Sequence, residues 1–357
     1  MAGKRQADGA IKFYENRAVN YDGTWHDDFT NRFVSYVDIE PGQQILDLAC
    51  GTGLLTFLEA DAVGASGHVV GVDVTPSMLK VAEFKQKKAG EKYSNVTFLE
   101  GDVLHLEELE PLKGKMFDLI TVASALVLFP EPKAAIEHWT QFLKPGGVLA
   151  VDATHPRNLV AGMVLERVAR RLELPIPYNR AWSKSESTLK ELLESAGLAV
   201  EKVATVDNQA GYGRRSYDMD QWDDFFVENV IVKDVTRIFA NNDIRRKAQG
   251  VYKEEWEKLA IDGKIEEVDS VFLGIARRQR SFCSKCGTPI TMFYTFEEDA
   301  VSLTLSSVDL DSMKCEPPIL KKHIFLREKA AWFMLAEDGA ERWGTCEDAH
   351  LLGSKKL

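Results

Sequence analysis

Buried-type strands alternate with amphipathic helices between residues 43 and 207 of the chain. Apolar runs end in small or acidic residues at "QQILDLA", "GHVVGVDV", "NVTFLEGDV", "FDLITVASAL" and "GVLAVDAT", and the segments between them have helical patterns. Strands rich in Val, Ile and Leu that are separated by helices are typical of a parallel sheet with both faces covered. The sequence therefore predicts an α/β fold built on a doubly wound sheet.

Two segments interrupt this alternation and are predicted to be helical insertions, residues 156–180 and 219–262. A further strand is predicted at "VDSVFLGIARR", where we expect it to close the sheet. Beyond residue 280 the pattern changes to short strands and turns. We therefore expect a first domain over residues 1–280, a small β-rich segment over 281–346 and a disordered tail over 347–357.

Composition restricts the classes of partner. The chain has 55 acidic and 44 basic side chains and a formal net charge of −11, and an acidic chain binds phosphate backbones poorly. No apolar stretch reaches the ~20 residues that span a bilayer, and the polar start "MAGKRQADGA" lacks the apolar segment of a signal peptide. Five cysteines, an odd number, argue against a disulfide framework. We expect a cytoplasmic protein without a nucleic-acid or membrane partner, and homo-oligomerisation stays open.

The turn DLACGTG, residues 47–53, follows the first strand. Small residues let the backbone approach a ligand closely, and glycine adopts turn conformations that a Cβ disfavours. Backbone N–H groups at the start of the next helix can then bind that ligand. The same pattern also fits a tight strand-to-helix turn without a ligand, so this turn alone decides nothing.

Acidic residues end the next two strands. Asp73 ends "VVGVD", where a carboxylate can accept hydrogen bonds from both ribose hydroxyls. Asp102 ends "FLEGD", where its carboxylate could accept a hydrogen bond from an adenine amino group. Because the carboxyl ends of parallel strands meet at one edge of a sheet, these residues and the glycine turn together indicate a nucleoside-bearing cofactor.

These motifs resemble those of class I S-adenosylmethionine-dependent methyltransferases, in particular the small-molecule enzymes of the ubiquinone and menaquinone pathways. The resemblance rests on "ILDLACGTG", "VVGVDVTPSML", "FLEGDV", "FDLITVASAL" and "FLKPGGVLAVDAT", and it covers about residues 11–207. It implies a Rossmann-like sheet, S-adenosylmethionine as cofactor and a small-molecule substrate. A dinucleotide-binding dehydrogenase is the competing interpretation of the glycine turn.

The resemblance also implies roles for individual residues. The glycine turn would surround the methionine part of the cofactor, Asp73 would hold the ribose and Met78 would pack on the adenine. Two N-terminal tyrosines would close over the cofactor, unless they only pin the first helix to the sheet. The complete set of implied cofactor-binding residues is Tyr14, Tyr21, Asp47, Ala49, Gly51, Gly53, Asp73, Met78, Asp102, Val103 and Ser124.

Methyl transfer from a sulfonium is an in-line displacement, in which the protein aligns the reactants and excludes water. A hydroxyl acceptor needs a general base, and histidine suits neutral pH. His155 in "DATHP" is the first candidate base and His26 in "YDGTWHDDF" the second, although His155 can equally be a polar loop residue. We predict O-methylation of a small molecule in specialised metabolism. N- or C-methylation and a non-catalytic cofactor-binding regulator are the alternatives.

Aromatic residues gather in the second insertion and are candidates for the wall of a substrate pocket. Aromatic residues at helical spacing are more often core residues, so each one taken singly favours packing. The candidate pocket residues are Trp222, Phe225, Phe226 and Trp256.

The C-terminal segment resembles half of another family. "SFCSKCGTPITMFY", "VSLTLSSVDL" and "HIFLREKAAWFML" are similar to the second half of the glutathione-dependent formaldehyde-activating enzymes, the CENP-V-like fold. In that family a CxxC pair helps to bind a structural zinc, and Cys283 and Cys286 match the pair. The cysteine-rich first half is absent, and one CxxC pair supplies only half of a zinc site. We therefore expect no zinc and a role in packing or oligomerisation.

Overall fold

The computed structural model describes residues 11, 14, 15, 17–174, 179–228, 239 and 241–278, together with four short strands between residues 291 and 342. The chain divides into two compact units, Met1–Arg280 and Ser281–Leu357. In the second unit, β10 (Thr291–Phe293) pairs with β11 (Val301–Leu303) and β12 (Lys322–His323) pairs with β13 (Glu341–Arg342). The Cys283 and Cys286 pair and the predicted tail lie outside the described residues.

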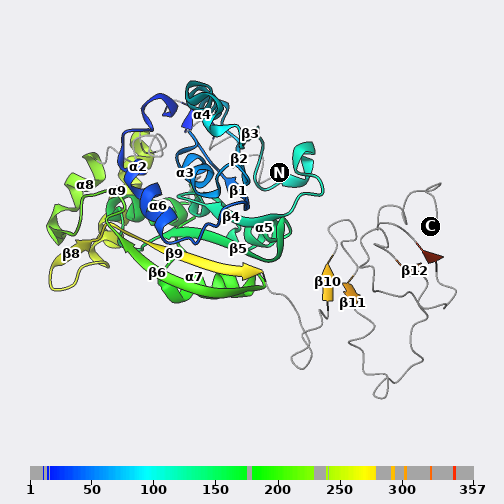
Figure 1. Ribbon diagram of the computed structural model, residues 1–357. Helices are drawn as coiled ribbons and strands as arrows, with labels where there is room; N and C mark the ends of the chain where they lie inside the picture. Colours follow the sequence, from blue (N-terminus) through cyan, green and yellow to red (C-terminus); the bar gives the residue numbers. More distant parts are fainter. Residues whose placement is uncertain are drawn as a thin grey trace, which may run out of the picture. The chain divides into compact units, whose positions relative to one another are not determined.

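A seven-stranded sheet forms the centre of the first unit (Figure 1), in the order β3-β2-β1-β4-β5-β9-β6. Its strands are β1 (Gln44–Leu48), β2 (His68–Asp73), β3 (Val96–Glu100), β4 (Phe117–Val122), β5 (Leu143–Thr154), β6 (Leu198–Asp207) and β9 (Ser270–Arg278). The strands β1 to β5 pair in parallel, whereas β9 is antiparallel to both of its neighbours. The predicted α/β class with a Rossmann-like sheet is confirmed, and the sheet is mixed.

The strand that was predicted to close the sheet lies inside it instead. β9 is inserted between β5 and β6, and its first seven residues are buried. Gly274 faces α7 (Glu186–Ser195) so closely that a Cβ would lie 2.7 Å from Cδ1 of Leu193. The long apolar run of this strand fits a central position, because an edge strand would expose one side to water.

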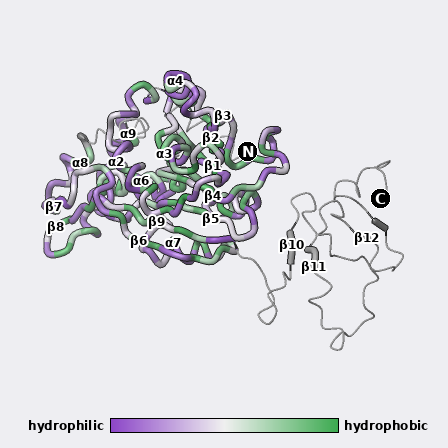
Figure 2. The backbone as a smooth tube through the Cα atoms, in the orientation of Figure 1, coloured by the Kyte–Doolittle hydropathy of each residue, from purple (hydrophilic) through white to green (hydrophobic). Residues whose placement is uncertain are grey.

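Helices cover both faces of the sheet, which explains why its strands are continuously apolar. Ile45 packs with Phe33 on one face, whereas its neighbour Leu46 belongs to the cluster of Trp139 and Leu193 on the other face. Figure 2 shows hydrophobic segments gathered at the sheet and a largely hydrophilic α4 outside it. The covering helices are α2 (Trp25–Ser35), α3 (Leu54–Val63), α4 (Pro76–Ala89), α5 (Pro132–Thr140) and α7.

Each predicted insertion contains helices. α6 (Val160–Arg171) lies in the first, and α8 (Trp222–Glu228) and α9 (Asn242–Glu257) lie in the second. The second is closed at its base by an antiparallel pair that the sequence did not predict, β7 (Arg215–Asp218) with β8 (Lys264–Glu267). The short 3₁₀ helices are η1 (Ala18–Asn20), η2 (Gly90–Tyr93), η3 (Leu106–Glu108), η4 (Glu110–Leu112), η5 (Leu126–Leu128) and η6 (Met219–Gln221).

Candidate active site

One cavity of about 750 Å³, partly open to solvent, lies at the carboxyl edge of the sheet. It gathers all the implied cofactor residues except Asp47 and Gly53. Its lining residues are Tyr14, Tyr21, Ala49, Gly51, Asp73, Val74, Thr75, Met78, Asp102, Val103, Leu104, Ala123, Ser124, Ala125, Leu128 and Phe129. The strand-end pattern therefore located the cavity, because residues that follow four parallel strands converge on it.

The glycine turn has a left-handed backbone at three positions. Ala49, Gly51 and Gly53 have φ angles of 55°, 56° and 79°, a region that glycine adopts without steric cost. A Cβ at Gly53 would lie 2.9 Å from Cζ of Phe98, so this glycine packs against β3. Gly51 has open space at the position of a Cβ and lines the cavity, where a ligand can approach the backbone.

Asp73 fastens the glycine turn to the end of β2. Its Oδ2 accepts the Gly51 N–H at 2.8 Å, and its Oδ1 accepts the Thr75 N–H at 2.8 Å. Burial raises the pKa of Asp73, while the two N–H donors act in the opposite direction. Each carboxylate oxygen has a second lone pair, so Asp73 can accept further hydrogen bonds from a ligand with two hydroxyls.

Asp47 lies behind the turn and not at the cavity wall. It is 1% exposed and accepts the hydroxyl of Thr56 at 2.5 Å. Burial raises the pKa of Asp47 to about 7. Glu59 on α3 is also fully buried, and burial followed by the charge of Asp47 raises its pKa. Sequence reasoning missed Glu59, although the apolar composition of "LLTFLEADAV" on all sides of the helix was a signal that its glutamate is buried.

The two N-terminal tyrosines lie at the cavity wall, with ring centroids 6.4 Å apart in an edge-to-face arrangement. Asp22 ties their segment to the core, because its Oδ1 accepts the hydroxyl of Thr52 at 2.5 Å and its Oδ2 pairs with Lys85 Nζ at 2.7 Å. Burial, and then nearby carboxylates, raise the pKa of Tyr21. The hydroxyl of Tyr21 therefore stays protonated and can donate a hydrogen bond.

His26 is one aromatic ring away from the cavity, and its ring stacks on those of Tyr21 and Trp25 at centroid distances of 3.9 and 3.7 Å. The Thr24 hydroxyl donates to the Tyr21 carbonyl at 2.7 Å, so it accepts from Nδ1–H of His26 at 2.7 Å. Nε2 then carries the lone pair of the neutral ring. Burial, and then the charge of Arg17, lower the pKa of His26 to about 4, so the ring is neutral near pH 7.

His155 does not line the cavity. Its Nδ1 accepts the backbone N–H of Arg157 at 3.1 Å, and its ring packs against Phe272 at a centroid distance of 5.0 Å. Burial, and then the Arg157 charge, lower the pKa of His155. A neutral imidazole that accepts at Nδ1 carries its proton on Nε2. The geometry therefore gives no support to the predicted general-base role, because neither nitrogen has a free lone pair.

Ser124 is held in the cavity wall by Asp152 of β5. Asp152 is 3% exposed, and its Oδ1 accepts the Ser124 N–H at 2.5 Å. Ser124 has a φ of 57°, a left-handed conformation that costs a non-glycine residue about 1–2 kcal/mol. Burial raises the pKa of Asp152 to about 7. Sequence reasoning missed Asp152, although an aspartate near the end of an apolar strand was the signal that had identified Asp73.

A family model described as a methyltransferase domain matches residues 39–224. The chain belongs to this methyltransferase family. The demethylmenaquinone methyltransferase of Lysinibacillus sphaericus (strain C3-41) is 27% identical to it over 223 residues, which are 60% of this chain and 92% of the relative. The demethylmenaquinone methyltransferase of Anoxybacillus flavithermus (strain DSM 21510 / WK1) is 30% identical over 190 residues, 53% of this chain and 76% of the relative.

Solved structures with similar chain folds include a SAM-dependent methyltransferase from Aquifex aeolicus, with a TM-score of 0.38, 24% identity and coverage of 49% of this chain and 82% of that one. The YcgJ protein from Bacillus subtilis has a TM-score of 0.46, 18% identity and coverage of 72% and 100%. The family match identifies an S-adenosylmethionine-dependent methyltransferase and sets the dehydrogenase interpretation aside. In the described part of the methyltransferase, no helix is both long and apolar enough to cross a membrane.

The structure places the aromatic residues of the second insertion away from the cavity of the methyltransferase. Trp256 is fully buried, and the ring of Phe225 stacks on it at a centroid distance of 4.9 Å. Phe226 packs on Tyr252 at 5.2 Å, and Trp222 packs at the edge of the same cluster. These side chains bury their apolar surface against α6. Because that packing occupies them, none of the four predicted pocket residues lines the cavity.

Leu128 and Phe129 form a cavity wall that sequence reasoning missed. The prediction extended the fourth strand through "ASAL", whereas β4 of the methyltransferase ends at Val122 and the chain continues as η5. The apolar residues after β4 were therefore predicted to be part of the strand and not of the cavity wall. Phe129 packs edge to face on Trp139 of α5 at a centroid distance of 5.2 Å, which joins this wall to the core.

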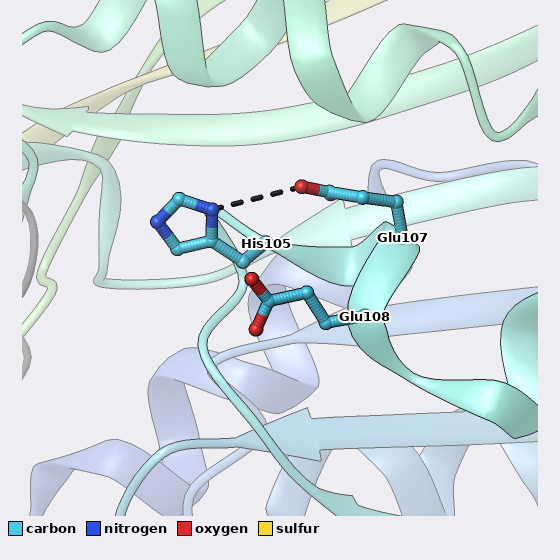
Figure 3. Close-up of side chains that lie close together, drawn as sticks. All are labelled: His105, Glu107 and Glu108. Carbon is cyan, nitrogen blue, oxygen red and sulfur yellow. Dashed lines mark ion pairs between the residues drawn. The ribbon is translucent and has the colours of Figure 1, made fainter.

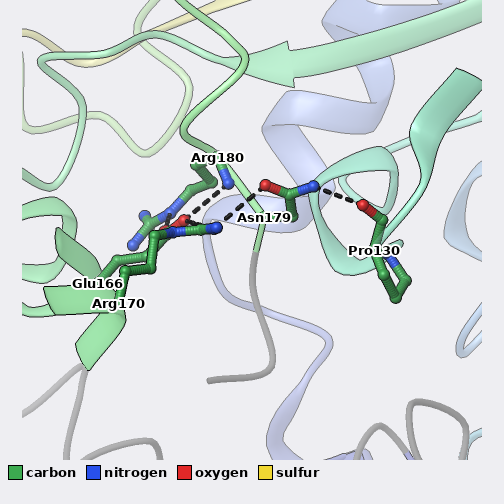
Figure 4. Close-up of polar contacts among 5 residues, drawn as sticks. All are labelled: Pro130, Glu166, Arg170, Asn179 and Arg180. Carbon is green, nitrogen blue, oxygen red and sulfur yellow. Dashed lines mark hydrogen bonds and ion pairs between the residues drawn. The ribbon is translucent and has the colours of Figure 1, made fainter. Parts of the chain in front are cut away.

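A charge network centred on a buried glutamate lies beside this wall (Figure 4). Glu166 of α6 is 2% exposed, and it accepts Nε–H and the backbone N–H of Arg180, both at 2.8 Å. Arg170 donates to Glu166 at 2.7 Å and to Oδ1 of Asn179 at 3.1 Å. The amide of Asn179 in turn reaches the carbonyl of Pro130 at 2.6 Å.

His105, Glu107 and Glu108 form an exposed cluster on the loop after β3 (Figure 3), with their ligand-type atoms within 4.8 Å of one another. His105 Nδ1 lies 3.6 Å from Glu107 Oε1, and His138 Nε2 lies 3.4 Å from Glu107 Oε2. Glu107 therefore lies between the two histidines at the surface of the methyltransferase. We assign no metal to the cluster, because exposed acidic side chains gather without one and no second observation points to a ligand.

Proposed function

We propose that the enzyme methylates an apolar aromatic small molecule that carries a hydroxyl group, such as a reduced quinone. The observation that carries this proposal is that one cavity has a polar wall and an apolar wall. One wall, with Gly51 and Asp73, offers backbone and carboxylate groups of the kind that bind a nucleoside cofactor. The other wall, with Ala125, Leu128 and Phe129, is apolar and suits an aromatic acceptor.

On this proposal S-adenosylmethionine supplies a methyl group on a sulfonium, and the residues of the chain bind and orient. Asp73 would accept hydrogen bonds from the ribose hydroxyls, and Met78 would pack on the adenine, which Asp102 and Val103 would flank. Tyr14 and Tyr21 would cover the cavity and exclude water, which favours an in-line displacement. The left-handed backbone at Ala49 and Gly51 supports this assignment, because it brings the main chain to the cavity without large side chains.

The relatives favour a ring carbon as the methylated atom, because those compared above are named for methylation of demethylmenaquinone, a quinone. O-methylation of a phenolic specialised metabolite is the second candidate. The observation that favours it is the Nε2 lone pair of His26, which has no partner in the described part of the chain and belongs to a ring stacked on Tyr21 of the cavity wall. A neutral imidazole can act as a general base, and His26 would reach an acceptor hydroxyl only if the acceptor extends past Tyr21 of the cavity wall.

The test is incubation of the purified enzyme with ¹³C-methyl S-adenosylmethionine and 1,4-naphthohydroquinone under anaerobic, reducing conditions, next to a panel of simple phenols. Mass spectrometry detects the transferred label, and NMR distinguishes a ring methyl from a methoxyl group. We expect a ring methyl on the naphthohydroquinone. A methoxyl group would select the second candidate, and label on amines alone would overturn both.

Asp73→Ala tests the cofactor assignment in the same assay, and Asp61→Ala is its control. We expect Asp73→Ala to abolish measurable S-adenosylhomocysteine binding in calorimetry and label transfer together, because it removes the acceptors assigned to the ribose. Wild-type affinity in this variant would contradict the assignment. Asp61→Ala, which removes an exposed carboxylate paired with Lys92 at 2.9 Å, should leave both measurements unchanged.

A further inference from the structure

The apolar cavity wall is attached at both ends to one residue of the first insertion. The backbone N–H of Asn179 donates to the carbonyl of Val127 at 2.6 Å, and its Nδ2 donates to the carbonyl of Pro130 at 2.6 Å. Leu128 and Phe129, which lie between these two carbonyls, line the cavity. A single asparagine therefore bridges the segment that carries the apolar wall.

Asn179 is itself held by the charge network of α6 (Figure 4). Its Oδ1 accepts from Arg170 at 3.1 Å, and its neighbour Arg180 is fixed by two bonds of 2.8 Å to Glu166. The side chain of Arg180 is 9% exposed and that of Glu166 is 2% exposed, so water competes little for this ion pair. Asn179 is thus connected, through Arg170 and through its neighbour Arg180, to the buried carboxylate of Glu166.

The opposite side of the wall is packed in the core. Leu128 N–H and Phe129 N–H bond to the carbonyls of Ala125 and Leu126 within the short η5 turn, and the ring of Phe129 rests on Trp139. η5 has only three residues, and isolated 3₁₀ turns hold their shape weakly. The contacts at Val127 and Pro130 therefore add to this core packing in holding the wall in place.

We propose that Asn179 is a positioning residue that sets the shape of the acceptor side of the cavity. The first insertion then contributes to acceptor selection through the carbonyls of Val127 and Pro130, whereas the aromatic residues of the second insertion form core. This inference rests on the proposed function for the placement of the acceptor against Leu128 and Phe129. The cofactor side of the cavity is formed by the turn after β1 and by Asp73, which are not among the residues that Asn179 bridges.

Two substitutions separate the contacts of Asn179. Asn179→Ala removes the side-chain bonds to Pro130 and Arg170 while leaving the backbone bond to Val127. Asn179→Asp keeps an acceptor for Arg170 but places a carboxylate against the Pro130 carbonyl, so its effect on the wall should be at least as large. Asn31→Ala is the matched control, because it also removes an asparagine amide that donates to a backbone carbonyl, that of Asp27 at 2.8 Å, on the exposed side of α2.

The first measurement is hydrogen–deuterium exchange of residues 126–130, which needs no acceptor. We expect Asn179→Ala to speed exchange of the Leu128 and Phe129 amides about fivefold, the equivalent of one hydrogen bond of ~1 kcal/mol. S-adenosylhomocysteine affinity should stay within twofold of wild type in all three variants. Unchanged exchange rates in both Asn179 variants would overturn the proposal. A fold-loss of S-adenosylhomocysteine affinity as large as the fold-increase in exchange rate would also overturn it.

The second measurement is the split between KM and kcat for 1,4-naphthohydroquinone. Asn179→Ala should raise KM about fivefold and leave kcat within twofold, because the aligned cofactor is untouched. An equal fall in kcat with unchanged KM would refute a role in acceptor fit. If wild-type enzyme does not methylate this probe, the proposed acceptor class is refuted, and the exchange and cofactor-affinity measurements still decide whether Asn179 positions the wall.

Discussion

Replacement of Glu166 by alanine should destabilise the first unit more than any surface ion-pair substitution. The glutamate is 2% exposed and accepts three hydrogen bonds, two from Arg180 and one from Arg170, at 2.7–2.8 Å. Removing it breaks the ion pair that Glu166 makes with the Arg180 side chain, which is 9% exposed. Breaking a buried pair in this way costs about 3–5 kcal/mol in the free energy of unfolding.

The assay is equilibrium urea unfolding followed by tryptophan fluorescence and far-UV circular dichroism. Glu254→Ala is the matched control, since Glu254 pairs with Arg171 at 2.8 Å on the surface and its side chain is 59% exposed. That substitution should change the free energy of unfolding by less than about 1 kcal/mol. Equal effects of the two substitutions would refute the argument, because they would mean that burial of the Glu166 network contributes nothing to stability.

Three further predictions concern groups near the cavity and in the second unit. Burial raises the pKa of Asp152 from 3.8 to about 7, so the contribution of its protonated form to stability is lost as the pH rises through that window. Between about pH 5 and about pH 8, wild type should therefore lose more urea resistance than Asp152→Asn, and parallel losses would contradict the buried carboxyl. His155→Ala should keep S-adenosylhomocysteine affinity and most turnover, because Nδ1 of His155 is already engaged; a loss of turnover with intact binding would restore its predicted role as base. For Cys283 and Cys286, we expect atomic absorption of the purified protein to find a zinc stoichiometry near zero, and one zinc per chain would reverse that expectation.

The cavity was predictable from sequence because its residues come from strand ends. Asp73 and Gly51 follow apolar runs whose length and composition identify buried parallel strands, and the topology of such sheets then brings their carboxyl ends together. Asp152 carries the same signal near the end of β5. The fold of the first unit was predictable for the same reason, since alternation of strands and helices leaves few arrangements.

The rest depended on contacts between segments distant in sequence. The tautomer of His155 is set by its contact with the Arg157 backbone, which no residue pattern reveals. The aromatic spacing that predicted a pocket at Trp256 is equally the spacing of a core, and the presence of α6 decided between the two. The bridge at Asn179 joins residues 49 and 52 positions apart, between elements whose packing no local pattern records.

The central place of β9 has a consequence for how the chain can be divided. β5 and β6 are not paired with each other, and both pair with residues 270–278, which follow the whole second insertion. A chain cut at residue 224, where the family match ends, would leave β5 with one unpaired edge and β6 without any partner strand in the sheet. During synthesis the same edges stay open until the last strand emerges, so completion of the sheet must wait for the insertion to be made. The boundary of the domain in sequence comparison is therefore not the boundary of the unit that can fold.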